Sequence, residues 1–238
     1  MNPIIQVQNT SFAYSKNEWI FHEMNFDVFS GEILGIIGKS GSGKTTLCHM
    51  LKGVIPHSIK GYLRRIISVN GFNVRKSSLV TLAKSIGLVF QNINSQLFAN
   101  TVREEIQFGL RNLKMNLSLA EDAMRELKIL DIAERSPQNL SMGQKQRVVL
   151  ASIIAMRPRV LLLDEPSVHL DIQNRSDLKN WLEKINQDYH MTILIASNDP
   201  RLIGEVCNEV LMVEDCSVVK RNKTEILELG TTWNWIEE

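Results

Sequence analysis

The residues best suited to chemistry form a glycine-rich segment that matches the pattern GxxxxGK[ST]. They are Gly38, Lys39, Ser40, Gly41, Ser42, Gly43, Lys44 and Thr45, and Thr46 is the next phosphate-binding candidate along the chain. Glycines let the backbone curl so that successive N–H groups face phosphate oxygens, and a following helix N-terminus adds partial positive charge. Lys44 can reach the β- and γ-phosphates, and Thr45 can offer its hydroxyl to Mg²⁺. The segment therefore predicts a phosphate-binding site.

A second candidate site lies where the apolar run 160–163 ends in two adjacent carboxylates, Asp164 and Glu165. Buried strands rarely end in paired acids without a use, although an acidic strand end by itself is often only solvated. Asp164 can hold Mg²⁺ through its water shell, and Glu165 can polarise an attacking water molecule. Beside the glycine-rich segment, the two carboxylates predict a site that activates water next to bound phosphate.

Local patterns predict the strands and helices that position these residues. Alternation at 5–7 and 24–28 indicates sheet, and Asn70-Gly71 indicates a hairpin turn. The continuous apolar runs suit strands buried on both faces; they are 32–38, 159–163 and 191–196. Helices are expected over 44–52, 101–113, 118–130 with a capping box from Ser118, about Ser141 to Pro158, and 171–189.

Strand and helix alternate at both ends of the chain, which indicates a parallel α/β core. A helical block over about 92–157 lies between them and indicates an inserted subdomain. The length of 238 residues allows one or two domains, and 44% hydrophobic and 22% charged residues are ordinary globular values. The formal net charge of +1 argues against a global attraction to nucleic acid or acidic lipid.

The apolar runs are shorter than a membrane-spanning helix needs, and the N-terminus has no signal-peptide pattern. We therefore expect a soluble, intracellular protein. Its three cysteines, Cys48, Cys207 and Cys216, lack CxxC spacing and are expected to be reduced. The five histidines show no metal-ligand spacing, so they predict no metal site.

A third motif, Leu140-Ser141-Met142-Gly143-Gln144, carries a resemblance to a known family. It resembles the LSGGQ signature of the ATP-binding cassette (ABC) ATPases, and the motifs follow the family's order over about 4–219. The resemblance implies that two cassettes face head to tail, with each ATP between the phosphate loop of one and the signature of the other. Ser141, Gly143 and Gln144 would then serve the partner's γ-phosphate. Ser141 is also a helix N-cap candidate, and helix N-termini attract anions.

The resemblance implies the α/β fold of an ABC ATPase cassette in a single domain, 1–238. This fold has a P-loop NTPase core, an N-terminal antiparallel β subdomain and an inserted α-helical subdomain. The core with its β subdomain would comprise 1–91 and 158–238, and the helical signature subdomain would comprise 92–157.

Three further positions match the family. Tyr14, 24 residues before Gly38, would stack on adenine, or it is an ordinary sheet tyrosine. Gln91 would touch Mg²⁺ and relay to a transmembrane partner, or it is a polar loop residue. Asp171 would belong to the loop that couples the two sites, and it is also a helix N-cap candidate.

Several segments narrow the resemblance to one branch of the family; they are 90–92, 95–98, 101–106, 108–110, 135–137 and 55–57. They look like the energy-coupling factor (ECF) branch, whose ATPases power importers of vitamins and transition-metal ions. This implies three partners: a second ABC ATPase subunit, a transmembrane coupling subunit and a substrate-binding membrane protein. It also implies a cytoplasmic location on the inner face of the cell membrane and no nucleic-acid partner. The cargo is chosen by another polypeptide, so no residue here identifies it.

Two positions depart from the family pattern. Met142 replaces the first glycine of LSGGQ, where the backbone N–H survives. Asn198 stands where the family has a histidine that contacts the γ-phosphate, and an amide cannot become cationic. Loss of a charged hydrogen bond in the transition state slows turnover by roughly 10- to 100-fold.

These features leave three hypotheses: an importer ATPase, a weakened nucleotide-binding half of a heterodimer, and a soluble cassette protein that acts on DNA or ribosomes. Near-neutral charge and the ECF-like segments oppose the third. Trp233 and Trp235 near the C-terminus leave docking on this chain or on a partner open.

Overall fold

A six-stranded sheet carries the phosphate loop in the computed structural model, which describes residues 2–16, 18–168, 170–222 and 224. Trp233 and Trp235 lie outside the described residues. The strand order is β10-β9-β3-β8-β7-β6. The strands are β3 (Ile33–Ile37), β6 (Ile86–Val89), β7 (Val160–Asp164), β8 (Thr192–Ala196), β9 (Glu209–Glu214) and β10 (Ser217–Asn222). All neighbouring pairs are parallel except β9 and β10. The predicted parallel core is therefore confirmed.

A second, antiparallel sheet has the order β2-β1-β4-β5. Its strands are β1 (Ile5–Ala13), β2 (Trp19–Val28), β4 (Tyr62–Val69) and β5 (Phe72–Asn73). Along β2, Met24, Phe26 and Val28 are buried, and the residues between them are exposed, as period two predicts. Asn70 (φ 50°) and Gly71 (φ 77°) are both left-handed between β4 and β5, so the predicted hairpin turn is confirmed.

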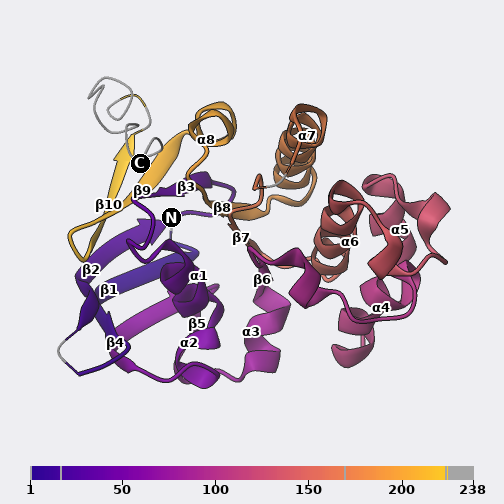
Figure 1. Ribbon diagram of the computed structural model, residues 1–238. Coiled ribbons are helices and arrows are strands. Elements are labelled where there is room, and N and C mark those ends of the chain that lie inside the picture. The colour runs from indigo at the N-terminus through magenta and orange to yellow at the C-terminus, as the bar shows by residue number, and fades with distance from the viewer. Residues whose placement is uncertain (1, 17, 169, 223, 225–238) are drawn as a thin grey trace.

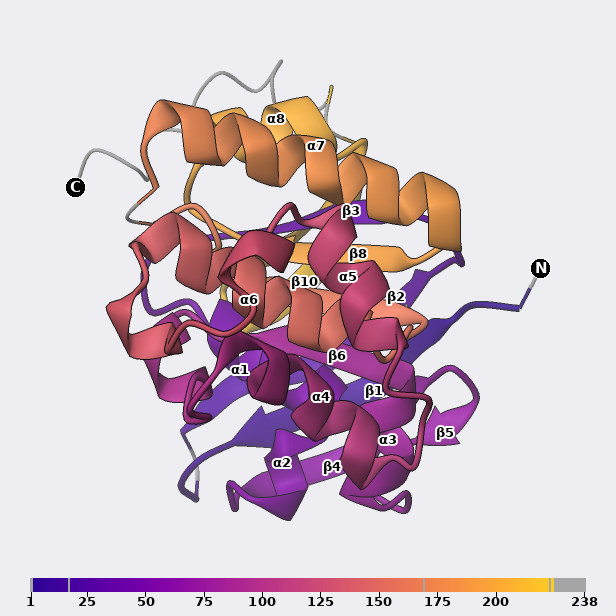
Figure 2. The ribbon, with the colours of Figure 1, turned by 90° about the vertical axis from the view of Figure 1, so that its right-hand side faces the viewer.

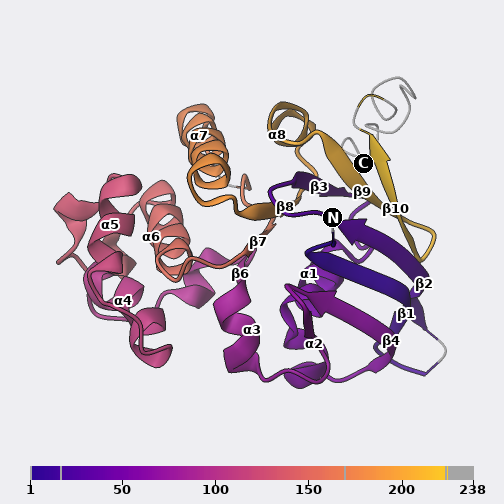
Figure 3. The same ribbon diagram turned by 180° about the vertical axis from the view of Figure 1, so that it is seen from behind.

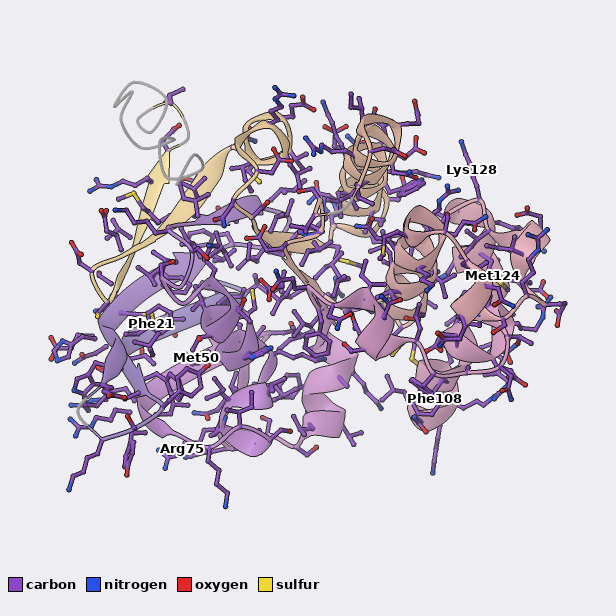
Figure 4. All side chains as sticks on the ribbon, in the orientation of Figure 1. Phe21, Met50, Arg75, Phe108, Met124 and Lys128 are labelled. Atoms are coloured by element: carbon purple, nitrogen blue, oxygen red, sulfur yellow. The ribbon has the colours of Figure 1, made fainter. Side chains whose placement is uncertain are left out.

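Helix α1 (Lys44–Lys52) lies between the two sheets, as Figure 1 shows. Its buried side chains, among them Leu47, Met50 and Leu51, join the two sheets in one hydrophobic cluster, and Met50 and Phe21 mark this region in Figure 4. The short helices α2 (Val54–His57) and α3 (Leu79–Ser85) follow. Helices α7 (Ile172–Tyr189) and α8 (Pro200–Val206) lie on the other side of the six-stranded sheet (Figure 2).

Three helices form a group beside the sheets, at one end of the molecule in Figures 1 and 3. They are α4 (Val102–Asn112), α5 (Leu119–Glu126) and α6 (Met142–Ile154). The 3-10 turn η1 (Ile93–Gln96) precedes α4, and the 3-10 turns η2 (Leu130–Ile132) and η3 (Pro137–Asn139) lie between α5 and α6. Each helix of the group packs against the other two. Among the described residues, no helix is long and apolar enough to cross a membrane.

The structure corrects three predictions about helix ends. Ser118 has helical dihedrals and makes no side-chain cap bond; the side chain of Asn116 accepts its N–H at 3.0 Å instead, so the predicted capping box is wrong. Helix α5 ends at Glu126 because Lys128 turns left-handed (φ 54°). Helix α6 ends at Ile154 and not at Pro158 as predicted, and Arg157 in the segment between them is left-handed (φ 51°).

Candidate nucleotide-binding and hydrolysis site

The phosphate loop between β3 and α1 depends on glycine. Gly38, Gly41 and Gly43 have φ angles of 155°, 79° and 111°, which L-residues rarely adopt. A Cβ atom on Gly38 would lie 2.4 Å from the carbonyl oxygen of Val213 on β9. Gly43 is the N-cap of α1, and in the part of the chain that the structure describes no side chain caps this helix end. The first N–H groups of α1 are therefore available to an anion.

The ammonium group of Lys44 lies inside this loop. Its Nζ donates to the carbonyl oxygens of Gly38 at 2.9 Å and Lys39 at 3.2 Å, and the residue is only 7% exposed. Burial lowers the pKa of Lys44, and the nearby carboxylates Glu165 and Asp164 oppose this shift. A bound phosphate would supply the anionic partner that the loop carbonyls replace here.

A pocket of about 390 Å³ opens beside the loop. It is lined by Ser40, Gly41, Gly43, Lys44, Thr45, Thr46, Gln91, Glu165, Val168 and Asn198. Gln91, Glu165 and Asn198 come from segments that follow β6, β7 and β8, whose carboxyl ends meet at one edge of the sheet. Ligand sites in open α/β sheets lie at this edge. The structure therefore brings together most of the predicted phosphate and catalytic residues.

Asp164, the last residue of β7, has the chemistry of a metal ligand. It is 3% exposed, and its Oδ1 has no hydrogen-bond partner among the described residues, while the nearby hydroxyl of Thr45 favours the ionised carboxylate. Burial raises the pKa of Asp164, opposed by the Thr45 hydrogen bond and the charges of His49 and Lys44. An unsatisfied buried carboxylate oxygen beside a hydroxyl fits the oxygen ligands that Mg²⁺ prefers.

Glu165 adopts a left-handed conformation (φ 50°) where the chain leaves the sheet. Such a conformation costs a non-glycine residue about 1–3 kcal/mol and persists only where its surroundings impose it. Its N–H donates to the carbonyl oxygen of Ala196 at 2.7 Å. Its Oε2 accepts from the hydroxyl of Ser197 at 3.3 Å and the backbone N–H of Asn198 at 3.2 Å. Burial raises the pKa of Glu165, and the Asn198 N–H opposes this most strongly.

Tyr14 lies next to the phosphate loop. Its ring meets Phe12 edge to face with centroids 4.9 Å apart, and its hydroxyl is 2.9 Å from the hydroxyl of Thr46. The residue is 44% exposed, which leaves part of its surface free to contact a base.

The signature residues form a second group, at the N-termini of α6 and α7. Ser141 and Gln144 form a capping box at the start of α6, and Asp171 caps α7 through the N–H of Asn174 at 2.7 Å. A Cβ atom on Gly143 would lie 2.4 Å from Oδ1 of Asn174, so the two helix ends touch. Among the described residues that line the phosphate pocket, none comes from this group.

Sequence reasoning missed two polar contacts behind the pocket. Gln146 is 4% exposed, and its side-chain amide donates to the carbonyl oxygen of Pro166 at 2.6 Å. Arg175 on α7 forms an ion pair with Asp199 at 3.2 Å. Gln146 follows Gly143 by three residues on the buried face of α6, so a polar residue at an apolar helix position was an available signal.

The fold and this pocket define an ATP-binding cassette. The model of the ABC transporter family matches residues 21–168, and the chain belongs to this family of ATP-binding, ATP-hydrolysing subunits. It is 39% identical over 227 residues to a Pyrococcus abyssi protein named as an ABC transporter ATP-binding protein, covering 93% of this chain and 81% of that protein.

The names of two further similar proteins specify a type of transporter. The energy-coupling factor transporter ATP-binding protein EcfA2 of Caldanaerobacter subterraneus is 35% identical over 238 residues, covering 94% of this chain and 78% of EcfA2. The structure of CbiO1 from Clostridium perfringens, part of the ABC transporter complex CbiONQ, has a TM-score of 0.84 and 28% identity. That match covers 96% of this chain and 92% of CbiO1.

Proposed function

We propose that this chain hydrolyses ATP to drive an ECF-type importer of a vitamin or a transition-metal ion. The observation that carries the proposal is the pocket in which the phosphate loop, Gln91, Glu165 and Asn198 converge. The similarity to EcfA2 and CbiO1 supports the importer class.

The proposed chemistry follows from the positions of the side chains. Lys44 would exchange the carbonyls of Gly38 and Lys39 for the β- and γ-phosphate oxygens. Thr45, Asp164 and Gln91 would hold Mg²⁺, which when bound neutralises charge on the phosphates. Glu165 would orient and polarise the attacking water.

Other residues would hold the rest of the nucleotide and the γ-phosphate. The loop residues from Gly38 to Thr46 would surround the phosphates, and Tyr14 would stack on adenine. Asn198 would donate a neutral hydrogen bond to the γ-phosphate. Its backbone N–H holds Glu165 independently of its side chain.

The proposal includes a second ABC ATPase subunit. Ser141, Gly143, Gln144 and Asp171 sit apart from their own pocket and would complete the pocket of the facing subunit, with residues 92–157 as the helical signature subdomain. The remaining partners are a transmembrane coupling subunit and a substrate-binding membrane protein. The chain would lie on the inner face of the cell membrane, and its net charge of +1 favours no nucleic-acid partner.

A second candidate function is that of a weakened nucleotide-binding half, paired with a more active cassette. The observation that favours it is Asn198, which lines the pocket with an uncharged side chain. The intact carboxylates Asp164 and Glu165 favour the first candidate.

The test is Mg²⁺-ATP turnover of the purified chain beside Glu165→Gln. Turnover that Glu165→Gln abolishes supports a self-sufficient ATPase. Tight ATP binding with negligible turnover supports the weakened half. If the chain neither binds nor hydrolyses ATP, both candidate functions are wrong. If the chain co-purifies with nucleic acid instead of membrane subunits, it does not belong to the importer class.

A further inference from the structure

The turn that carries Glu165 receives a hydrogen bond from a side chain of the helical group. Gln146 lies in the first two turns of α6, and its amide donates to the carbonyl oxygen of Pro166 at 2.6 Å. Both residues are buried. This bond therefore satisfies a buried carbonyl group immediately after Glu165.

The backbone at Glu165 needs such support. Its left-handed conformation is imposed on one side by the bond from its N–H to Ala196 on β8. On the other side the chain turns through Pro166, and the N–H of Val168 returns to the Glu165 carbonyl at 3.3 Å. The Gln146 amide fixes the middle of this turn from a different element.

The same helix begins with the signature residues Ser141 and Gly143. An α-helix rises 1.5 Å per residue, so Gln146 lies only about 7.5 Å along the helix axis from Ser141. A displacement of the N-terminus of α6 therefore reaches the Pro166 carbonyl through Gln146, without passing through the phosphate loop.

We propose that Gln146 is a positioning residue that couples the placement of the signature helix α6 to the orientation of the Glu165 carboxylate. This inference rests on the proposed function, because it assumes that Glu165 polarises the attacking water. Gln146 itself does not line the phosphate pocket.

The experiment compares Gln146→Met with Arg147→Met in the full chain. Gln146→Met removes the amide donor and keeps much of the side-chain volume. Arg147 is the next residue on α6, and its guanidinium lies 5.4 Å from the ring centroid of Trp181 on α7. Arg147→Met therefore weakens a contact between α6 and α7 and keeps the hydrogen bond from Gln146 to Pro166.

We expect Gln146→Met to lower kcat by about 10- to 100-fold, the effect of misplacing a reacting group by about 1 Å. ATP affinity, measured by binding, should stay within about twofold, because the phosphate contacts are intact. Arg147→Met should leave kcat within about twofold. An unchanged kcat for Gln146→Met, an equal loss in Arg147→Met or a parallel loss of ATP affinity would overturn the inference.

Gln146→Asn keeps the amide on a side chain that is one methylene shorter. This variant tests the inference if Gln146→Met does not fold. It should lower kcat at unchanged ATP affinity, and hydrogen exchange should quicken at the N–H of Val168 but not in α1. Unchanged exchange and kcat overturn the inference. Wild-type turnover that Glu165→Gln does not alter identifies failure of the proposed function instead.

Discussion

The hydroxyl groups of Tyr14 and Thr46 lie 2.9 Å apart and join the segment after β1 to the first turn of α1. This contact fixes the open ring of Tyr14 beside the phosphate loop, where a base could stack on it. Tyr14→Ala should weaken ATP binding by about 5- to 150-fold, the range for loss of one aromatic–base stack.

Tyr14→Phe is the matched control, because it keeps the ring and removes only the hydroxyl. Calorimetry of ATP and of inorganic triphosphate separates the base from the phosphates. If Tyr14→Ala weakens triphosphate binding as much as ATP binding, the ring does not stack on adenine.

Asn198→His should raise kcat by about 10- to 100-fold, because a cationic donor stabilises the transition-state phosphate more than an amide does. Asn198→Ala provides the reference, since the backbone N–H that bonds Glu165 survives it. Steady-state turnover of the three proteins measures the effect. Equal kcat for the wild type and Asn198→His would show that the side chain makes no such contact.

Asp164→Asn should stabilise the nucleotide-free protein at neutral pH. Burial raises the folded-state pKa of Asp164 above the unfolded value, so the native state binds the proton more readily. The contribution of Asp164 to the free energy of unfolding is greatest below the pKa that this group has in the unfolded chain. It falls as the pH rises through the higher pKa of the folded state. The variant should therefore melt higher at pH 7, by roughly 2–4 °C for each kcal/mol, and converge on the wild type near pH 4.

Asp131→Asn, which changes an exposed carboxylate on η2, should leave the melting temperature unchanged at both pH values. Asp164→Asn should also weaken the dependence of ATP binding on Mg²⁺, to which Thr45 and Gln91 would still contribute. A lower melting temperature at pH 7 would contradict the assignment of Asp164 as an unsatisfied buried carboxylate.

Lys52, at the end of α1, should make stability depend on alkaline pH. Burial lowers its pKa to about 8, and its Nζ donates to the carbonyl oxygen of Ile86. Between pH 8 and the unfolded value near 10.4, the unfolded chain binds more protons, so stability rises with pH. Lys52→Met should remove this rise in urea midpoints measured from pH 7 to 10. Lys84→Met, at an exposed position on α3, should retain it.

Much of the fold could be predicted because its signals are local. The apolar run before Gly38 and the Asn70-Gly71 pair each specify a backbone conformation within a few residues. Helix ends were less predictable, because they depend on tertiary contacts. Ser118 and Ser141 both precede a Glu or Gln by three residues, yet only Ser141 forms the capping box.

In the candidate site, too, the residues in local motifs could be predicted and the contacts between distant segments could not. The phosphate loop and the Asp164-Glu165 pair are contiguous motifs, so sequence predicts their residues directly. The hydrogen bond from Gln146 to Pro166 joins a helix to a turn 20 residues later in the chain, and no local pattern encodes it. The same holds for the close approach of Asn174 to Gly143.

The place of β3 in its sheet sets the order in which a growing chain can assemble. Its two neighbours are β8 and β9, and Ile37 at its end pairs with Met212. On the ribosome, the strand that leads into the phosphate loop therefore waits for about 170 more residues before both of its edges are paired. The antiparallel sheet needs only the first 73 residues. We therefore expect nucleotide binding to be acquired late, after β8 and then β9 have emerged.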